Sequence, residues 1–490
     1  MRPSSFEEYV DKEVRISCPD CQARDQTIAW MQGLLLVLAA EIARQNARID
    51  ALEAQLGQNS RNSHRPPSTD PPSAEKPKRD PSARKPGGQP GHPGSTRPLV
   101  PPERIDKMVD VFPERCGQCG EALPPKPEGE PVRHQDFEIP EIRPVVTEHR
   151  LHAVTCECCG AVTRADLPAG VPAGAFRPRL MALILLLRGA YRMSLRHVEE
   201  FFKDAFGVQI SLGSLKNVED KVSNALAPAV EEIHQAVKES SEPVSADETT
   251  HWEKGKRFYL WVAVTSFAAI FLIRARRTAE VAKELLGRIG RIVVTDRFAG
   301  YEWIPVWFRQ VCLAHLRRDY RKMEDCGGQA GRIGAALGSA LDEIFSLWHR
   351  FKGGTLARST LRRKVAPLRH RIRELLLDGT AVAAIAGTCR KMLEVEPAMY
   401  TFVRVPGVEP TNNNGERALR HPVIWRKTSF GTWCEAGSRY AERILTVVAT
   451  LRIQKRNVLA YLTEACRSAI TGHAASSLLP QTCPAARPAA

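Results

Sequence analysis

Apolar residues recur at alternating steps of three and four along residues 25–57, a spacing that predicts one long helix. Such a seam is typical of a coiled coil, so residues 1–57 are predicted to hold a leucine-zipper-like helix through which the chain self-associates. Packing of this helix against its own chain is the alternative. The seam consists of Ile28, Met31, Leu35, Leu38, Ile42, Gln45, Ile49, Leu52 and Leu56.

Proline replaces the hydrophobic pattern from residue 58 onward. Residues 58–104 hold twelve of the chain's 35 prolines and almost no apolar side chains, a composition that predicts a disordered linker. The lysines and arginines of this linker make a basic arm of the kind that neutralises DNA phosphates. A solvated spacer is the alternative.

Residues 105–170 are turn-rich, and the residues between two Cys-x-x-Cys pairs alternate as in strands. The first pair is Cys116 and Cys119, the second is Cys156 and Cys159, and a glycine follows each. Zinc takes four such ligands in a tetrahedron, so we predict one structural zinc site held by these four thiolates, although Cys158 is a competing thiol. A further pair, Cys18 and Cys21, has no second pair to complete a site.

Helical patterns fill residues 171–240. Residues 177–192 are strongly apolar; Ser194 is placed to cap a helix over 195–206 that ends at Gly207, and Ser211 or Gly213 opens the next helix. Helix, short turn and helix is the order of a helix-turn-helix DNA reader, although any helical bundle contains such turns.

From residue 244 the pattern changes to strands, read at 244–248, 256–265, 268–274, 291–295 and 309–313, with a helix at 278–287. This order predicts a ribonuclease-H-like mixed α/β catalytic domain over residues 241–455, with a helical insertion at about 320–405. Residues 456–490 are predicted to form a C-terminal helix and a disordered tail. The predicted fold class is therefore multidomain α+β.

Acidic residues end the first and fourth of these strands, at Asp247 and Asp296. If the two strands are adjacent and parallel, the two carboxylates lie side by side, and a divalent cation relieves their repulsion. Oxygen ligands favour magnesium or manganese, and Glu416, in the first turn of a helix, is placed to supply a third carboxylate. Glu248 is the rival of Asp247, and only one of these strand neighbours can face the site.

Charge and composition indicate the class of partner and exclude some classes of protein. The 490 residues carry a net charge of +15, which favours a polyanionic partner, and a hydrophobic fraction of 43% excludes a wholly disordered chain. No unbroken apolar run reaches the roughly 18 residues of a membrane span, and no secretory signal opens the chain, so a soluble, cytoplasmic protein is predicted.

Several motifs occur together in one order along the chain. They are GGQPGH at 87–92, the two Cys-x-x-Cys-Gly pairs, ADETT at 246–250, TDRFAGY at 295–301, CLAHLRR at 312–318 and NNGERALR at 413–420. In these motifs the chain resembles the DDE transposases of the bacterial insertion-sequence family numbered sixty-six. It departs from that family at Arg297 and Phe298, where Gly and Tyr are more common.

The resemblance implies a bacterial, nucleoid-associated transposase that binds double-stranded DNA at terminal inverted repeats and cuts and joins strands with magnesium or manganese. Asp247, Asp296 and Glu416 would be the catalytic, metal-binding acids, and a homo-oligomer, with accessory proteins of the same element, would pair the ends. The expected DNA-binding residues are Arg317, Arg318, Arg417, Arg420, Arg426 and Lys427. The alternatives are a catalytically decayed transposase that acts as a DNA-binding regulator and a ribonuclease-H-like nuclease without strand joining.

Overall fold

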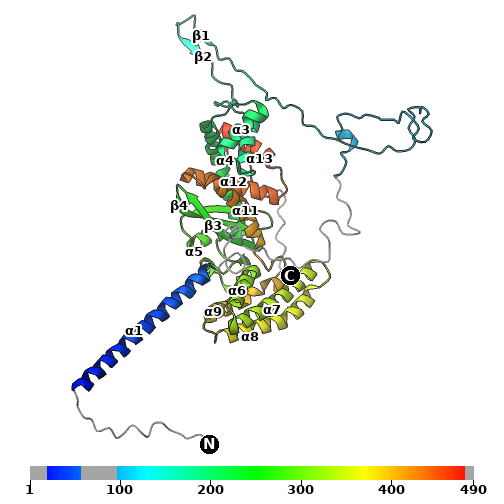
Figure 1. The fold of residues 1–490 in the computed structure, drawn as a ribbon. Helices are drawn as coiled ribbons and strands as arrows, with labels where there is room; N and C mark the ends of the chain where they lie inside the picture. The colour runs from blue at the N-terminus through cyan, green and yellow to red at the C-terminus, as the bar shows by residue number, and fades with distance from the viewer. Residues whose placement is uncertain (1–18, 57–96, 481–490) are drawn as a thin grey trace. The chain divides into compact units, whose positions relative to one another are not determined.

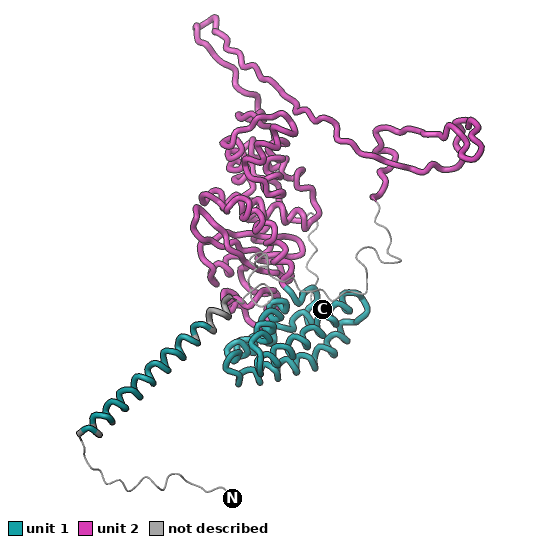
Figure 2. Tube along the Cα trace, viewed as in Figure 1, with its two compact units in different colours: residues 1–74, 311–411 teal, residues 75–310, 412–490 magenta. Residues whose placement is uncertain are grey.

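The computed structural model describes residues 19–56 and 97–480 and divides the chain into two compact units (Figure 2). The first unit contains residues 1–74 and 311–411, and the second contains residues 75–310 and 412–490. Helices and strands are labelled in Figure 1, and their mixture confirms the predicted α+β class. Most of the predicted linker and part of the predicted tail lie outside the described residues. Cys18 lies outside them as well.

Helix α1, Pro19–Leu56, occurs where the seam predicts a helix. Its described apolar side chains are exposed, among them Leu35 at 64% and Ile42 at 60%. The segment Gln26–Asn46 has a mean hydropathy of 1.4, so by length and composition alone it could cross a membrane. Unbroken apolar runs in this segment are short, because polar residues interrupt them, and only the average over a longer window reaches this hydropathy.

The segment before α2 has little regular structure. Short strands β1 (Ala153–Thr155) and β2 (Val162–Arg164) form an antiparallel pair, and Arg115 makes an isolated bridge with Ala122. The β-rich character predicted for residues 105–170 is therefore wrong for most of this stretch. Prolines, which cannot donate to a strand ladder, interrupt the alternation at 124, 125, 127, 131, 140 and 144.

A helical layer follows, and its capping agrees with the sequence. Ser194 accepts a hydrogen bond from the amide of His197 at the start of α3, and Gly207 ends that helix in the left-handed conformation. Of the two predicted starting residues, Ser211 caps the next helix, which runs as far as Glu239. The helices of this layer are α2 (Pro178–Gly189), α3 (Leu195–Phe206), α4 (Leu212–Glu239) and α13 (Val458–Thr471).

A five-stranded sheet in the order β5-β4-β3-β6-β7 forms the centre of the second unit. Strand β3 pairs antiparallel with β4 and parallel with β6, which confirms the predicted neighbourhood of the first and fourth strands. Helix α5 (Ala279–Leu286) connects β5 and β6. The strands are β3 (Val244–Glu253), β4 (Lys256–Val264), β5 (Ala269–Arg274), β6 (Val293–Thr295) and β7 (Arg309–Val311).

Helix α12, Glu435–Ile453, covers the free edge of this sheet. The amides of Ala269 and Phe271 donate to the hydroxyls of Thr450 and Thr446, both at 3.1 Å, and the amide of Ile273 donates to Glu442. Four helical residues rise about 6 Å, nearly the length of two strand residues, so the partners stay in step. The edge amides are thus satisfied and closed to another strand.

Residues 311–411 are helical, as predicted for the insertion. Gly334 allows α6 and α7 to pack closely, because a Cβ atom there would lie 2.6 Å from the carbonyl oxygen of Tyr320. The helices are α6 (Leu313–Asp325), α7 (Gly328–Lys352), α8 (Arg358–Gly379), α9 (Ala386–Glu394) and α10 (Thr401–Arg404).

Candidate active site

The parallel pairing of β3 and β6 aligns two of the predicted acids. Val244 lies opposite Val293, and Ser245 lies opposite Val294. The same register, continued by two residues beyond the paired positions, sets Asp247 level with Asp296. The side chain of Asp296 accepts a hydrogen bond from the amide of Phe298 at 2.9 Å, which fixes the turn that follows β6.

Helix α11, Asn413–Ser429, carries Glu416 in its first turn and is held close to β3. Asn412 occupies the N-cap, but its side chain makes no cap hydrogen bond; instead, its Nδ2 atom donates to the carbonyl of Ala246 at 2.8 Å. A Cβ atom on Gly415 would lie 3.0 Å from the Cβ atom of Asp247. Glycine therefore permits the approach that places Glu416 beside Asp247. An asparagine before a helix would be expected to cap it, but Asn412 bonds to β3 instead.

The raised pKa of Asp247 reflects its burial and the nearby acidic side chains. Burial raises its pKa well above the usual value, and the nearby carboxylates of Glu248, Asp296 and Glu416 raise it further. Several acids that destabilise one another's charged forms are the environment that a divalent cation relieves. The residues present therefore fit magnesium or manganese, with Asp247, Asp296 and Glu416 as the groups that would hold it.

Glu248, the rival of Asp247, is engaged elsewhere. Its carboxylate pairs with Arg277 at 2.6 Å and accepts a hydrogen bond from the hydroxyl of Tyr301 at 2.5 Å. Arg277 also stacks on the ring of Phe298, 3.8 Å from its centroid. Burial and Asp296 raise the pKa of Glu248, whereas Tyr301 and Arg277 lower it. This arrangement favours Asp247 as the metal ligand and gives Glu248 a positioning role.

Four residues of this region were missed as participants by the sequence reasoning, namely Arg277, Tyr301, Asn412 and Gly415. Tyr301 lies in the TDRFAGY motif, Gly415 lies in the NNGERALR motif and Asn412 directly precedes it, so a signal was present for three of them. Arg277 lies in no motif, and only the packing of its segment against β3 and β6 reveals its contact with Glu248.

The predicted DNA-binding residues fall into two groups. Arg417, Arg420 and Lys427 are exposed along α11, whereas Arg426 of the same helix is half-buried and donates to the Thr250 hydroxyl at 2.7 Å. The remaining two, Arg317 and Arg318, lie on α6 in the other compact unit, where Arg317 pairs with Asp342 at 2.6 Å.

The four predicted zinc ligands lie in two knuckles of the same geometry. The amides of Cys116 and Cys156 donate to the residues five positions on, both at 2.8 Å, and Gly120 and Gly160 donate back at 2.9 Å. Both glycines have positive φ, at 75° and 70°, which explains their place after each pair. Within residues 97–480, the structure does not gather the four thiols into one cluster.

Backbone amides in each knuckle favour a thiolate. The pKa of Cys116 is lowered by the amides of Cys119 and Gln118, and that of Cys156 by the amides of Cys159 and Cys158. Because the thiolate is the form that binds metal, each knuckle fits zinc on its own chemistry. Cys158 is exposed beside the second pair and stays a competing thiol.

Comparison with protein families shows which family the chain belongs to. Residues 173–440, more than half of its length, match the model described as the Transposase IS66 family. The chain belongs to the IS66 transposase family. The matched segment contains β3, β6 and the first turn of α11, and so all three predicted acids.

Two further models match the N-terminal part. Residues 113–160 match the zinc-finger binding domain of transposase IS66, which supports structural zinc and spans both knuckles. Residues 17–98 match a family of unknown function, DUF6444. The chain is also 27% identical over 402 residues to the uncharacterized protein y4hP of Sinorhizobium fredii, covering 73% of this chain and 71% of that protein.

His251 on β3 gives this part of the IS66-family fold a pH dependence. The ring is buried, its Nε2 atom lies 3.0 Å from the Thr432 hydroxyl, and burial together with Arg426 lowers its pKa from 6.5 to about 4. Between these two values the unfolded chain binds a proton that the native chain does not. Stability is therefore lost as the pH falls from 6.5 towards 4.

We expect His251→Gln to remove this component, because glutamine does not titrate. Urea unfolding at pH 7 and pH 5 should show that the wild type loses about 2 kcal/mol more than the variant over this interval. His473→Gln, at an exposed histidine, is the control and should keep the wild-type pH dependence. Equal losses in the wild type and in His251→Gln would contradict the assignment.

Proposed function

We propose that this protein is a DDE transposase that binds the ends of its element and catalyses metal-dependent DNA cleavage and strand transfer. The observation that carries the proposal is that Asp296, after β6, and Glu416, on α11, both come close to Asp247 on the adjacent strand β3. Membership of the IS66 transposase family supports the DNA substrate. The strand order, with β3 between β4 and β6, supports a ribonuclease-H-like catalytic domain.

The residues of the site divide the work of phosphoryl transfer. Asp247, Asp296 and Glu416 would hold one or two divalent ions, which polarise the scissile phosphate and activate water or a 3′-hydroxyl as the nucleophile. Arg420 follows Glu416 by one helical turn, so its charge is available to a phosphate oxygen on the same face. The Glu248–Arg277–Tyr301 group would fix the strand beside Asp247 without binding the ion itself.

The other segments would supply binding and assembly. The zinc knuckles, the α3–α4 pair and the exposed basic residues of α11 would contact the terminal inverted repeats, and α1 would pair two chains. The same proposal includes companion proteins of the element and a cytoplasmic, nucleoid-associated location. It also keeps the domain boundaries predicted from the sequence.

Charge removal at the acids tests the chemistry. Asp247→Asn, Asp296→Asn and Glu416→Gln keep side-chain size and remove the carboxylate charge, so magnesium-dependent cleavage of an end should fall by several orders of magnitude while DNA binding persists. The assay is cleavage of a labelled terminal inverted repeat, with band-shift binding alongside. Glu302→Gln, at another acid of the same unit, is the control and should cleave normally.

Strand transfer at the wild-type rate by Asp296→Asn would contradict the triad. An active Asp247→Asn together with an inactive Glu248→Gln would mean that Glu248, and not Asp247, is the first acid of the triad. Binding without cleavage in the wild type would favour a regulator, and cleavage without joining would favour a nuclease.

Metal analysis tests the zinc segment. We expect about one zinc per chain, bound by Cys116, Cys119, Cys156 and Cys159, because a tetrahedral site needs the thiolates of both knuckles. Cys119→Ser together with Cys159→Ser should abolish the zinc, and Cys158→Ser should retain it. Chelation should unfold this segment, measured by proteolysis of residues 105–170, and leave the sheet domain intact. Zinc retained by the double variant would overturn this ligand set.

Charging the seam of α1 tests assembly. Leu38→Glu with Ile49→Glu should split the oligomer, because each buried seam residue contributes roughly 1.5–3 kcal/mol. Light scattering should show a smaller particle that binds one DNA end and fails to pair two. The matched control, Gln26→Glu with Ala40→Glu, adds the same charge off the seam. An unchanged mass would contradict pairing by α1, and sedimentation of the wild type with lipid vesicles would assign the helix to a membrane instead.

A further inference from the structure

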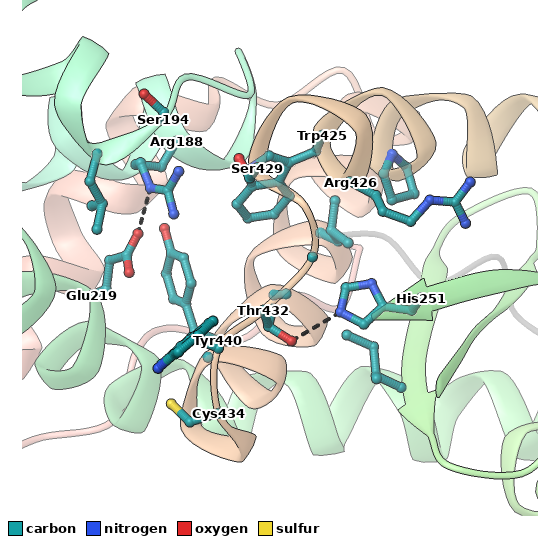
Figure 3. A pocket seen from close by; sticks show the side chains of 18 of the residues that line it. Arg188, Ser194, Glu219, His251, Trp425, Arg426, Ser429, Thr432, Cys434 and Tyr440 are labelled. Atoms are coloured by element: carbon teal, nitrogen blue, oxygen red, sulfur yellow. Dashed lines mark hydrogen bonds and ion pairs between the residues drawn. The ribbon is translucent and has the colours of Figure 1, made fainter. Parts of the chain in front are cut away.

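A cavity of about 430 Å³ lies between the helical layer and the far end of β3 (Figure 3). Asp247, Asp296 and Glu416 are not among its lining residues. Its volume is within the range of small-molecule sites, roughly 300–1,000 Å³. It is lined by segments far apart in the sequence, from α2 to α12, all within the second unit. Its apolar walls are Leu195, Leu212, Leu260, Ile273 and Leu445.

Three polar atoms on lining residues are buried and have no hydrogen-bond partner among the residues that the structure describes. They are the indole Nε1 of Trp425, the hydroxyl of Ser429 and the hydroxyl of Tyr440. Trp425 and Tyr440 are only 8% and 2% exposed. A buried polar group is stabilised by a hydrogen-bond partner, so these three atoms are suited to a ligand with several donors and acceptors.

The lining of the cavity combines positive charge with an exposed aromatic ring. Arg196, Lys216 and Arg426 are among the lining residues, although Lys216 also pairs with Asp220 at 2.5 Å. Trp433 lines the cavity too and is 80% exposed. The loop that carries Trp433 is pinned to the end of β3, because the amide of Thr432 donates to Trp252 at 2.8 Å and Lys254 donates back to Thr432 at 2.9 Å. An exposed ring on an anchored loop is suited to stacking rather than to the core.

The backbone before Trp433 is strained. Phe430 has a φ of 55°, which a bulky L-residue rarely adopts, and its side chain is 87% exposed. Gly431 follows with a φ of 93°, and a Cβ atom there would lie 2.1 Å from the carbonyl oxygen of Trp252. Backbone strain that presents two exposed aromatic rings is typical of a binding loop.

The distance from the acids to the cavity follows from the lengths of β3 and α11 between them. His251, a lining residue, follows Asp247 by four strand residues, about 13 Å. Arg426 follows Glu416 by ten helical residues, about 15 Å. One DNA strand rises about 3.4 Å per nucleotide, so both routes reach the cavity roughly four nucleotides from a phosphate held at the acids.

We propose that this cavity takes one nucleobase unstacked from the DNA end, close to the cleaved phosphate. The base would stack on Trp433 and present its hydrogen-bonding edge to Trp425, Ser429 and Tyr440, while the surrounding cations hold its backbone. This inference rests on the proposed function for its ligand, and it adds a recognition site separate from the acids.

The test uses the full-length protein, calcium in place of magnesium to prevent cleavage, and duplexes of the element's terminal repeat. One base at a time near the cleavage site is replaced by fluorescent 2-aminopurine or by an abasic site. We expect the fluorescence to change at one position, and Trp433→Ala should weaken binding about tenfold through lost stacking. An abasic site at that position should weaken wild-type binding similarly and add nothing further to Trp433→Ala.

Trp307→Ala is the matched control, because Trp307 is 62% exposed in the same unit and does not line the cavity. Tyr440→Phe, which removes only the hydroxyl, should reduce discrimination between bases at the coupled position. If Trp433→Ala and every abasic site weaken binding additively, and cleavage in magnesium is normal, the base site is overturned and the proposed function is not. If their effects on binding in calcium are not additive, but the protein does not cleave in magnesium, the proposed chemistry is overturned and the base site is not. Loss of self-association in Trp433→Ala, with DNA binding intact, would assign the cavity to a second copy of the chain.

Discussion

The close approach of α11 to β3 is the constraint on which the rest of the site depends. Asn412 and Ala246 are 166 positions apart in sequence, yet the amide of one donates to the carbonyl of the other at 2.8 Å. Gly415 allows this close contact without a shift of β3, since a Cβ atom there would lie only 3.0 Å from that of Asp247. Glu416 follows directly, so the contacts of Asn412 and Gly415 with β3 bring the first turn of α11 to Asp247.

This approach concentrates negative charge, and the surrounding residues organise that charge. Glu248 is neutralised by Arg277 and Tyr301, while Asp247 and Asp296 face the helix that brings Glu416. Two neighbours on one strand thus serve different purposes, one as a structural anchor and the other as a candidate ligand. A divalent cation held by the other three acids would relieve the repulsion left among them.

Much of the catalytic sheet was predictable, because strands alternate with period two and end in recognisable turns. The serine caps of α3 and α4 followed from local pattern, whereas the parallel pairing of β3 with β6 was expected only from the order of the elements. The cross-chain bond of Asn412 was not predictable, since an asparagine before a helix ordinarily caps that helix. The Glu248–Arg277 pair and the cavity at Trp425 and Tyr440 arise only when distant segments pack together.

Binding of the cation itself is the most direct test of this account. Crystals of the protein soaked with manganese should give an anomalous diffraction peak between the carboxylates of Asp247, Asp296 and Glu416, and the peak should be lost in Asp296→Asn. A well-ordered site with all three carboxylates in place and no peak at millimolar manganese, or a peak bound by Glu248 in place of Asp247, would contradict the central claim.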